Sequence, residues 1–204
     1  MVTHQWTQPG QPFPYPSGAV RLAIRLPIAL YRLGLGIVIG RAAPIMILTT
    51  RGRRSGLPRH TALEYRQHGS KFYLVSVWGE RAQWVQNLLA DPDVTVQYGH
   101  RTYAARARVV EDVGEAHRVA HLYRRQAPYL YDTVLAKVIN EPSVNPRQAM
   151  ETSDELTIIR LDRLPDAPPR IPPLRSDLAW VLPALTMLMS ATLGLLVATR
   201  TRRS

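Results

Sequence analysis

Residues 45–77 read IMILTTRGRRSGLPRHTALEYRQHGSKFYLVSV, and this stretch decides the fold of the chain. It holds three runs of β-forming residues separated by two short segments that contain glycine, which are typical of tight turns. Strands joined by such short turns pair antiparallel. The stretch therefore predicts three successive antiparallel strands, at Ile45–Thr50, Arg59–Arg66 and Lys71–Val77.

Three further strands and two helices are expected after this stretch. Val94, Val96 and Tyr98 alternate with polar residues, which is the pattern of a half-buried strand. Six short strands with two helices predict a mainly β (α+β) domain, an antiparallel barrel with helices over its openings. The remaining strands are expected at residues 94–98, 102–110 and 156–161, and the helices at residues 81–89 and 115–125.

The carboxyl end of the chain has a different composition. Residues 178–199 contain no charged residue over 22 positions, and a helix of that length covers roughly 33 Å, against about 30 Å of hydrocarbon in a bilayer. We expect a C-terminal transmembrane helix here, with a buried core helix as the alternative. Residues 164–176 contain five prolines and predict an extended linker.

These features divide the chain into four expected parts. Residues 1–40 form a polar amino end and an amphipathic helix, and residues 41–163 form the β-barrel domain. Residues 164–177 form the proline-rich linker, and residues 178–199 form the transmembrane helix. This organisation predicts a membrane-associated protein with its barrel domain on the cytoplasmic side.

The net charge of +11 lies in the two ends, since residues 1–63 hold eight arginines and no acidic residue, while residues 64–164 are balanced. In residues 19–39, Arg21, Arg25 and Arg32 lie on one side of a helix whose other positions are mostly apolar. Two interpretations remain open: the helix packs on the domain with its arginines in water, or it lies among lipid headgroups with its arginines on phosphates. Gly34, Gly36 and Gly40 indicate that regular helix ends near residue 33.

Composition and spacing exclude several function classes. The chain has no cysteine, so it has neither disulfides nor thiolate metal sites. The pair His117 and His121 lacks a third metal ligand and is typical of a solvated helix face, so no metal site is expected. No glycine fingerprint of a dinucleotide fold, P-loop or serine hydrolase is present. The arginines are not interleaved with exposed aromatic residues, so no nucleic-acid partner is expected.

The loop Gly52–Gly56 together with Arg59 is the first candidate site. Two glycines allow backbone N–H groups to converge, and three arginines with a serine hydroxyl surround them. This chemistry suits a phosphate group. The alternative is an exposed basic turn.

Several stretches together resemble one known family. They are LYRLGLG at 30–36, LTTRGRRSGLPR at 48–59, SVWG at 76–79 and WVQNLLADP at 84–92. The chain resembles, over about residues 20–163, the deazaflavin-dependent nitroreductase family, whose members reduce quinones and nitro compounds with coenzyme F-420. The resemblance implies a split β-barrel, as in oxidoreductases that bind flavin mononucleotide, and an oxidoreductase that transfers a hydride from reduced coenzyme F-420 to a quinone-like or nitro acceptor at the membrane.

The resemblance also implies a set of site residues. Cationic groups would hold the phosphate and acidic tail of the coenzyme, and residues near the end of the third strand would lie beside its ring system. Many members have Ser-Lys-Gly-Gly where this chain has residues 76–79, and Arg81 could supply the absent cation. The implied residues are Arg53, Arg54, Ser55, Gly56, Arg59, His60, Thr61, Ser76, Val77, Trp78, Arg81, Trp84 and Asn87.

Other expectations stay open at this point. Tyr129 and Tyr131 are candidate donors of the proton that a reduced quinone needs. The expected partners are a small-molecule acceptor and membrane lipid, and a homodimer is possible. The alternative function is a membrane-tethered split barrel that binds flavin mononucleotide or haem, without turnover.

Overall fold

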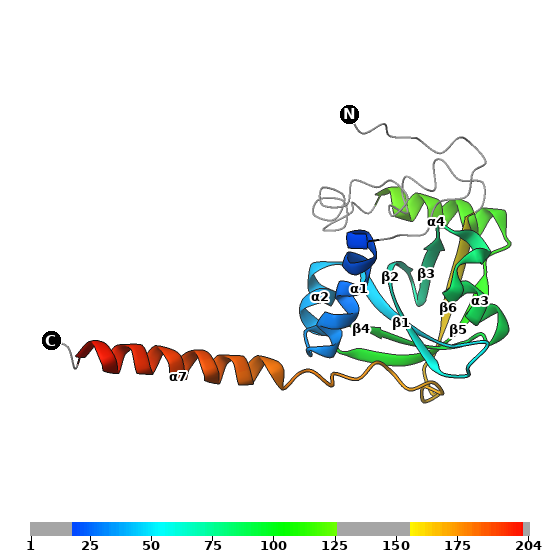
Figure 1. Cartoon of the computed structure of the whole chain (residues 1–204). Coiled ribbons are helices and arrows are strands. Elements are labelled where there is room, and N and C mark those ends of the chain that lie inside the picture. The colour runs from blue at the N-terminus through cyan, green and yellow to red at the C-terminus, as the bar shows by residue number, and fades with distance from the viewer. Residues whose placement is uncertain (1–17, 126–155, 202–204) are drawn as a thin grey trace.

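The computed structural model describes residues 18–125 and 156–201 (Figure 1). Two helices precede the first strand, and a single-turn 3-10 helix, η1 (Gly79–Arg81), precedes α3. The helices are α1 (Gly18–Arg32), α2 (Gly36–Ala42), α3 (Gln83–Ala90), α4 (Val113–Arg125) and α7 (Val181–Thr201). The strands are β1 (Ile45–Arg51), β2 (Pro58–His68), β3 (Lys71–Ser76), β4 (Asp93–Tyr98), β5 (Arg101–Val109) and β6 (Thr157–Leu164).

The six strands form a closed antiparallel barrel in the order β1-β2-β3-β6-β5-β4. The chain order is broken once, where β6 inserts between β3 and β5 and pairs Tyr73 with Arg160 and Ala107 with Leu161. The contact between β1 and β4, with Leu48 opposite Val96, closes the ring. The predicted antiparallel barrel and its flanking helices are confirmed.

The inside of the barrel is the main hydrophobic core. Met46 and Leu48 of β1 and Leu74 of β3 are fully buried there, because alternate residues of each strand point inward. Trp84 of α3 packs into the same core, so α3 is fixed to the barrel by burial of its apolar side. Four aromatic rings pack with centroids 5.5–6.1 Å apart in this core, namely Tyr65, Phe72, Tyr98 and Tyr103.

Helices α1 and α2 cover the outside of the barrel at β1, where Tyr31, Ile39 and Ile47 form a second core cluster. The helix break predicted near residue 33 is present, but a second helix, α2, follows it at once. Gly36 and Gly40 do not end the helix. A Cβ at either position would lie 2.8 Å from backbone atoms of Gly99, so the two glycines allow α2 to approach the β4–β5 turn closely.

The proline-rich segment after β6 is held against the barrel by several hydrogen bonds. We call residues 165–178 the strap. Ile171 is buried and its carbonyl accepts a hydrogen bond of 2.6 Å from Thr95 Oγ1. The Gln97 side chain forms two hydrogen bonds with the backbone of Leu174. Asp177 accepts two hydrogen bonds from the guanidinium of Arg32, at 2.6 and 2.8 Å.

The predicted transmembrane helix at residues 178–199 is wrong. Over the residues that the structure describes, no helix combines the length and the apolar character that a bilayer crossing requires. Helix α7 begins only at Val181, and Pro183, Thr186, Ser190 and Thr192 lie within it.

Helix α4 packs on the outside of the barrel through buried Val119 and Tyr123, and a carboxylate adds polar contacts. The Tyr73 hydroxyl donates a hydrogen bond of 2.7 Å to Glu115 Oε1, and Arg160 pairs with the same carboxylate at 3.1 Å. The hydrogen bond from Tyr73 and the charge of Arg160 lower the pKa of Glu115. Burial and the neighbouring carboxylate raise the pKa of Tyr73 to about 12.

We predict that Glu115→Gln lowers the free energy of unfolding by about 1–3 kcal/mol at neutral pH, because it weakens charged hydrogen bonds. The lowered pKa of Glu115 means that this stabilisation is present above the unfolded-state pKa of about 4.3 and is lost as the pH falls through the folded-state value. Urea unfolding at several pH values measures the difference, with Tyr73→Phe as the matched variant. A difference that stays constant into acid would contradict the assignment.

Candidate functional site

The predicted loop forms the turn between β1 and β2. Gly52 donates a hydrogen bond to the Leu57 carbonyl at 2.9 Å, and Gly56 donates one to the Gly52 carbonyl at 2.7 Å. Gly56 has a φ of 68°, in the left-handed region that favours glycine. A Cβ at Gly52 would lie 2.8 Å from Ser55 Oγ. Both glycines are therefore required by the conformation of this turn.

Asn87 of α3 fixes this turn to the rest of the protein. Its Oδ1 atom accepts hydrogen bonds from the backbone N–H and from Nη1 of Arg53, both at 3.2 Å. Its Nδ2 group donates to Thr50 Oγ1 at 3.3 Å. The Asn87 side chain is buried, with an exposed fraction of 6%, so these hydrogen bonds form out of competition with water. Trp84, one turn earlier, is buried in the barrel core and holds α3 in place.

The sequence suggested that the backbone N–H groups of the turn converge on one position that an anion could occupy. In the structure they do not. Gly52, Ser55 and Gly56 donate to carbonyl groups within the turn. Arg53 donates to Asn87, and Leu57 donates to Ser55 Oγ at 3.4 Å. An anion at this turn would therefore be held by arginine side chains rather than by a nest of backbone amides.

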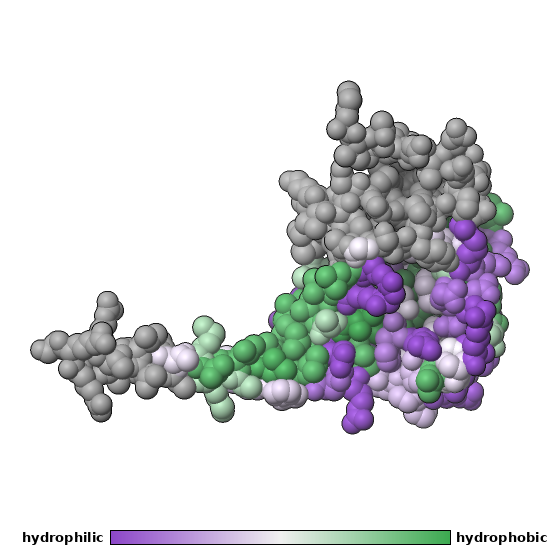
Figure 2. Space-filling model, viewed as in Figure 1, coloured by the Kyte–Doolittle hydropathy of each residue, from purple (hydrophilic) through white to green (hydrophobic). Residues whose placement is uncertain are grey.

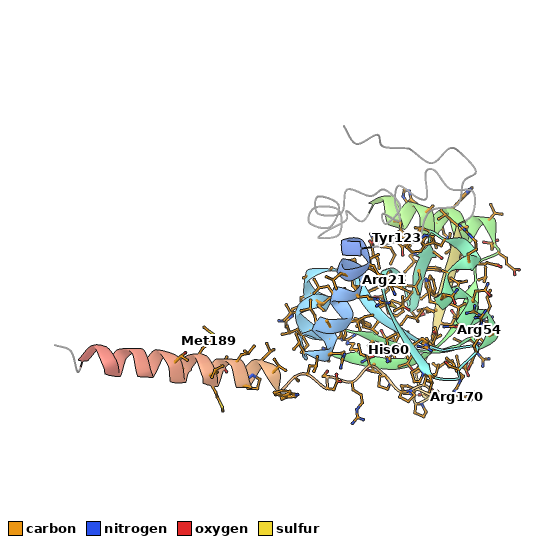
Figure 3. All side chains as sticks on the ribbon, in the orientation of Figure 1. Arg21, Arg54, His60, Tyr123, Arg170 and Met189 are labelled. Atoms are coloured by element: carbon orange, nitrogen blue, oxygen red, sulfur yellow. The ribbon has the colours of Figure 1, made fainter. Side chains whose placement is uncertain are left out.

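Among the described residues, three arginines of the turn have no carboxylate partner. The Arg53 guanidinium donates to Gln83 Oε1 at 3.1 Å and to Asn87, and Arg59 donates to Ser55 Oγ at 3.3 Å; these are neutral acceptors. Within residues 18–125 and 156–201, Arg54 forms no hydrogen bond or ion pair, and Figure 3 labels its position. Arg51, by contrast, is paired with Asp91 at 2.9 Å.

The structure does not bring His60 together with the neighbouring predicted residues. On β2, Leu63 and Tyr65 contribute to the barrel core, so Arg59 and Thr61 point to the same inner side and His60 points outward. There His60 Nδ1 lies 2.9 Å from Thr49 Oγ1, and burial lowers the pKa of the histidine. His60 is therefore separated by the sheet from the arginines of the turn.

The second predicted group follows β3. Ser76 is buried and its hydroxyl donates to the Gly79 carbonyl at 2.8 Å, which shapes the chain before α3. Val77 is buried, and Trp78 is half-buried and packs against the barrel core. Arg81 is exposed at the end of η1. Tyr129 and Tyr131, the candidate proton donors, lie outside the described residues.

Gln83 is not among the predicted site residues, although its position on α3 could have indicated its contact with the turn. It stands four residues before Asn87 on α3, and residues at that spacing share one face of a helix. Both side chains accept hydrogen bonds from the same guanidinium.

His117 and His121 are exposed on α4, and the described residues contain no group of three metal-ligating side chains.

A cavity of about 60 Å³ lies elsewhere, between the strap and strands β4 and β5. Its walls include Val94, Ala105 and Ile171, and Asp93 at its edge pairs with Arg106 and Arg170. None of the predicted site residues lines it.

The chain matches one family model, and it is similar to several known proteins. Residues 24–158 match the model of the family described as F420H(2)-dependent quinone reductase. The F420H(2)-dependent quinone reductase of Mycobacterium tuberculosis is 32% identical over 94 residues, which are 43% of this chain and 63% of that protein. A Mycobacterium bovis protein of the same description matches equally. A solved structure of an F420-H2-dependent reductase is 20% identical, with a TM-score of 0.39, and the match covers 58% of this chain and 93% of that one.

We predict that Asn87→Ala lowers the free energy of unfolding by about 1–3 kcal/mol, because it leaves the backbone N–H of Arg53 without its buried acceptor. The matched variant Gln83→Ala removes an exposed acceptor of the same guanidinium and is expected to cost less than about 0.5 kcal/mol. Urea unfolding measures both. Equal losses in the two variants would show that Asn87 does not fix the turn.

Proposed function

Because the chain belongs to the F420H(2)-dependent quinone reductase family, we propose that it is an oxidoreductase that reduces a quinone with F420H(2), the reduced form of coenzyme F-420. The resemblance found in the sequence is thereby confirmed at the level of the family. The matched segment spans 63% of the curated relatives, so the activity, the acceptor and the coenzyme's binding site are proposals for this chain.

The charge of the turn carries the proposal. Coenzyme F-420 has a phosphodiester and a glutamate tail, both anionic at neutral pH. Arg53, Arg54 and Arg59 present three guanidinium groups, and no carboxylate among the described residues pairs with them. A planar guanidinium matches phosphate and carboxylate oxygens with paired hydrogen bonds. The donor set of the turn therefore fits the anionic part of this coenzyme.

We propose different tasks for the three arginines, according to how each is held. Arg53 is held by Gln83 and Asn87, so it loses little conformational freedom when it binds an anion. Arg54 is exposed and free to turn toward the ligand, whereas Arg59 is held by Ser55. We assign the phosphodiester to Arg53 and Arg59 and the more distant glutamate tail to Arg54.

Residues 76–78 are proposed to lie beside the ring system of the coenzyme. The Ser76 hydroxyl is engaged with Gly79, so its part there is to fix the backbone that faces the ring. Buried Val77 and half-buried Trp78 would exclude water from one side of it. When bound, the reduced deazaflavin supplies a hydride to the acceptor, and the protein supplies orientation and a dry environment. His60 is not included, because it lies on the opposite face of the sheet.

Mixing the purified protein with F420H(2) and menadione tests the proposed activity. Oxidation of the coenzyme, followed by its absorbance, would support a quinone reductase, and a nitro compound in place of menadione tests the second acceptor class. Binding without oxidation would support a carrier instead. A yellow protein as isolated, with no response to F420H(2), would support the alternative of a flavin mononucleotide protein.

We predict that Arg54→Ala raises the Kd for coenzyme F-420 about 10- to 150-fold, because it removes charged hydrogen bonds worth about 1.5–3 kcal/mol. Arg54 is exposed and has no partner among the described residues, so folding is expected to be unaffected. The control Arg118→Ala removes an exposed arginine of α4 and should leave the Kd unchanged. Fluorescence titration measures the affinity, and an unchanged Kd for Arg54→Ala would remove this residue from the site.

A further inference from the structure

Helices α1 and α2 expose apolar side chains together with arginines on the side that faces away from the barrel. We call this surface the α1–α2 patch. Its apolar members are exposed by 46–74%. The patch comprises Arg21, Leu22, Arg25 and Leu26 of α1 and Ile37, Val38 and Arg41 of α2.

The barrel does not need these apolar residues. Helix α1 packs on the barrel through Ile28, Leu30 and Tyr31, and α2 packs through Ile39. Leu22 and Leu26 lie earlier in α1 than these contacts and are exposed by 74% and 55%. Packing of α1 on the domain with its arginines in water, which is one of the two interpretations left open above, does not explain these exposed leucines. The outer side of α1 carries arginine and leucine side by side.

The charge of the patch is of one sign. Arg21, Arg25 and Arg41 are exposed and form no ion pair with the described residues, and the first 63 residues of the chain contain no aspartate or glutamate. Figure 3 labels Arg21 on α1. A partner that covers this patch must therefore bring negative charge as well as apolar surface.

The residues just before α7 extend the apolar surface. The Leu178 N–H donates a hydrogen bond of 3.0 Å to the Arg32 carbonyl, and Ala179 packs on Gly34, which lies between α1 and α2. Trp180 follows and is exposed by 66%. Figure 2 shows apolar surface running from the α1–α2 side toward α7. An exposed tryptophan next to such a surface is typical of the boundary between lipid and water.

We propose that the α1–α2 patch binds the surface of an anionic lipid bilayer. The arginines contact lipid phosphates, and Leu22, Leu26, Ile37 and Val38 enter the boundary between headgroups and acyl chains. Arginine and leucine are adjacent in the exposed pairs Arg21–Leu22 and Arg25–Leu26, and a fluid headgroup layer satisfies both without a matching groove. This mode of binding lies in the plane of the interface and requires no helix that crosses the bilayer. It does not depend on the proposed reductase activity.

Co-sedimentation of the full chain with vesicles tests the proposal without any coenzyme. We expect binding to vesicles of phosphatidylcholine with added phosphatidylglycerol, weaker binding at high salt, and much less binding to phosphatidylcholine alone. The charge reversal Arg21→Glu with Arg25→Glu and Arg41→Glu should weaken binding at least about tenfold. Leu22→Ser with Leu26→Ser should weaken it about tenfold by removing apolar contact. Thermal unfolding checks that the variants remain folded, which their exposure predicts.

The matched control is Arg118→Glu, which reverses an exposed charge on α4 outside the patch and should leave vesicle binding unchanged. Three results would overturn the proposal: no binding to anionic vesicles, equal binding to both kinds of vesicle, or binding that neither set of patch variants weakens. Sedimentation velocity without lipid tests whether the patch instead joins two copies of the chain. A dimer that Leu22→Ser with Leu26→Ser converts to monomer would assign the patch to a second copy of the chain instead.

Discussion

The buried amide of Asn87 is the contact on which the candidate site depends. It joins the backbone and side chain of Arg53 and the hydroxyl of Thr50 to helix α3, which Trp84 fixes in the barrel core. Residues 53–57 of the turn are exposed, so the alternative of an exposed basic turn stays open. The Asn87 contact orients one arginine of the turn before any ligand arrives, and preorganised groups bind with a smaller entropic cost.

The barrel separates two kinds of surface. On the side of the turn, three guanidiniums lack carboxylate partners among the described residues, while elsewhere on the barrel Glu115, Asp93 and Asp177 each pair with arginines. Paired arginines hold segments together, and unpaired ones remain available to an anion. The strap and α1–α2 occupy another side, where Thr95 and Gln97 hold the strap. The proposed coenzyme site and the proposed lipid-binding patch therefore do not compete for the same residues.

The strands and the helices α3 and α4 could be predicted from local pattern, because alternation and turn residues act within a few positions. The contact of Asn87 with Arg53 could not, since the two residues lie 34 positions apart and only the closed barrel brings them together. Helix α2 was not predicted, because glycines such as Gly36 and Gly40 indicate a helix end from sequence alone, whereas here they serve close packing on Gly99. The outward direction of the His60 side chain could have been predicted from the alternation of residues along β2. The transmembrane segment was predicted from a long uncharged run, and no helix among the described residues meets the requirements of a bilayer crossing.

The central claim is that the arginines of the β1–β2 turn bind the anionic part of a deazaflavin coenzyme. A crystal structure with coenzyme F-420 tests it most directly. The account predicts guanidinium nitrogens of Arg53, Arg54 and Arg59 within about 2.7–3.2 Å of phosphate or carboxylate oxygens, with the Asn87 contact intact. Coenzyme bound elsewhere on the protein, with these three guanidiniums directed into solvent, would contradict it.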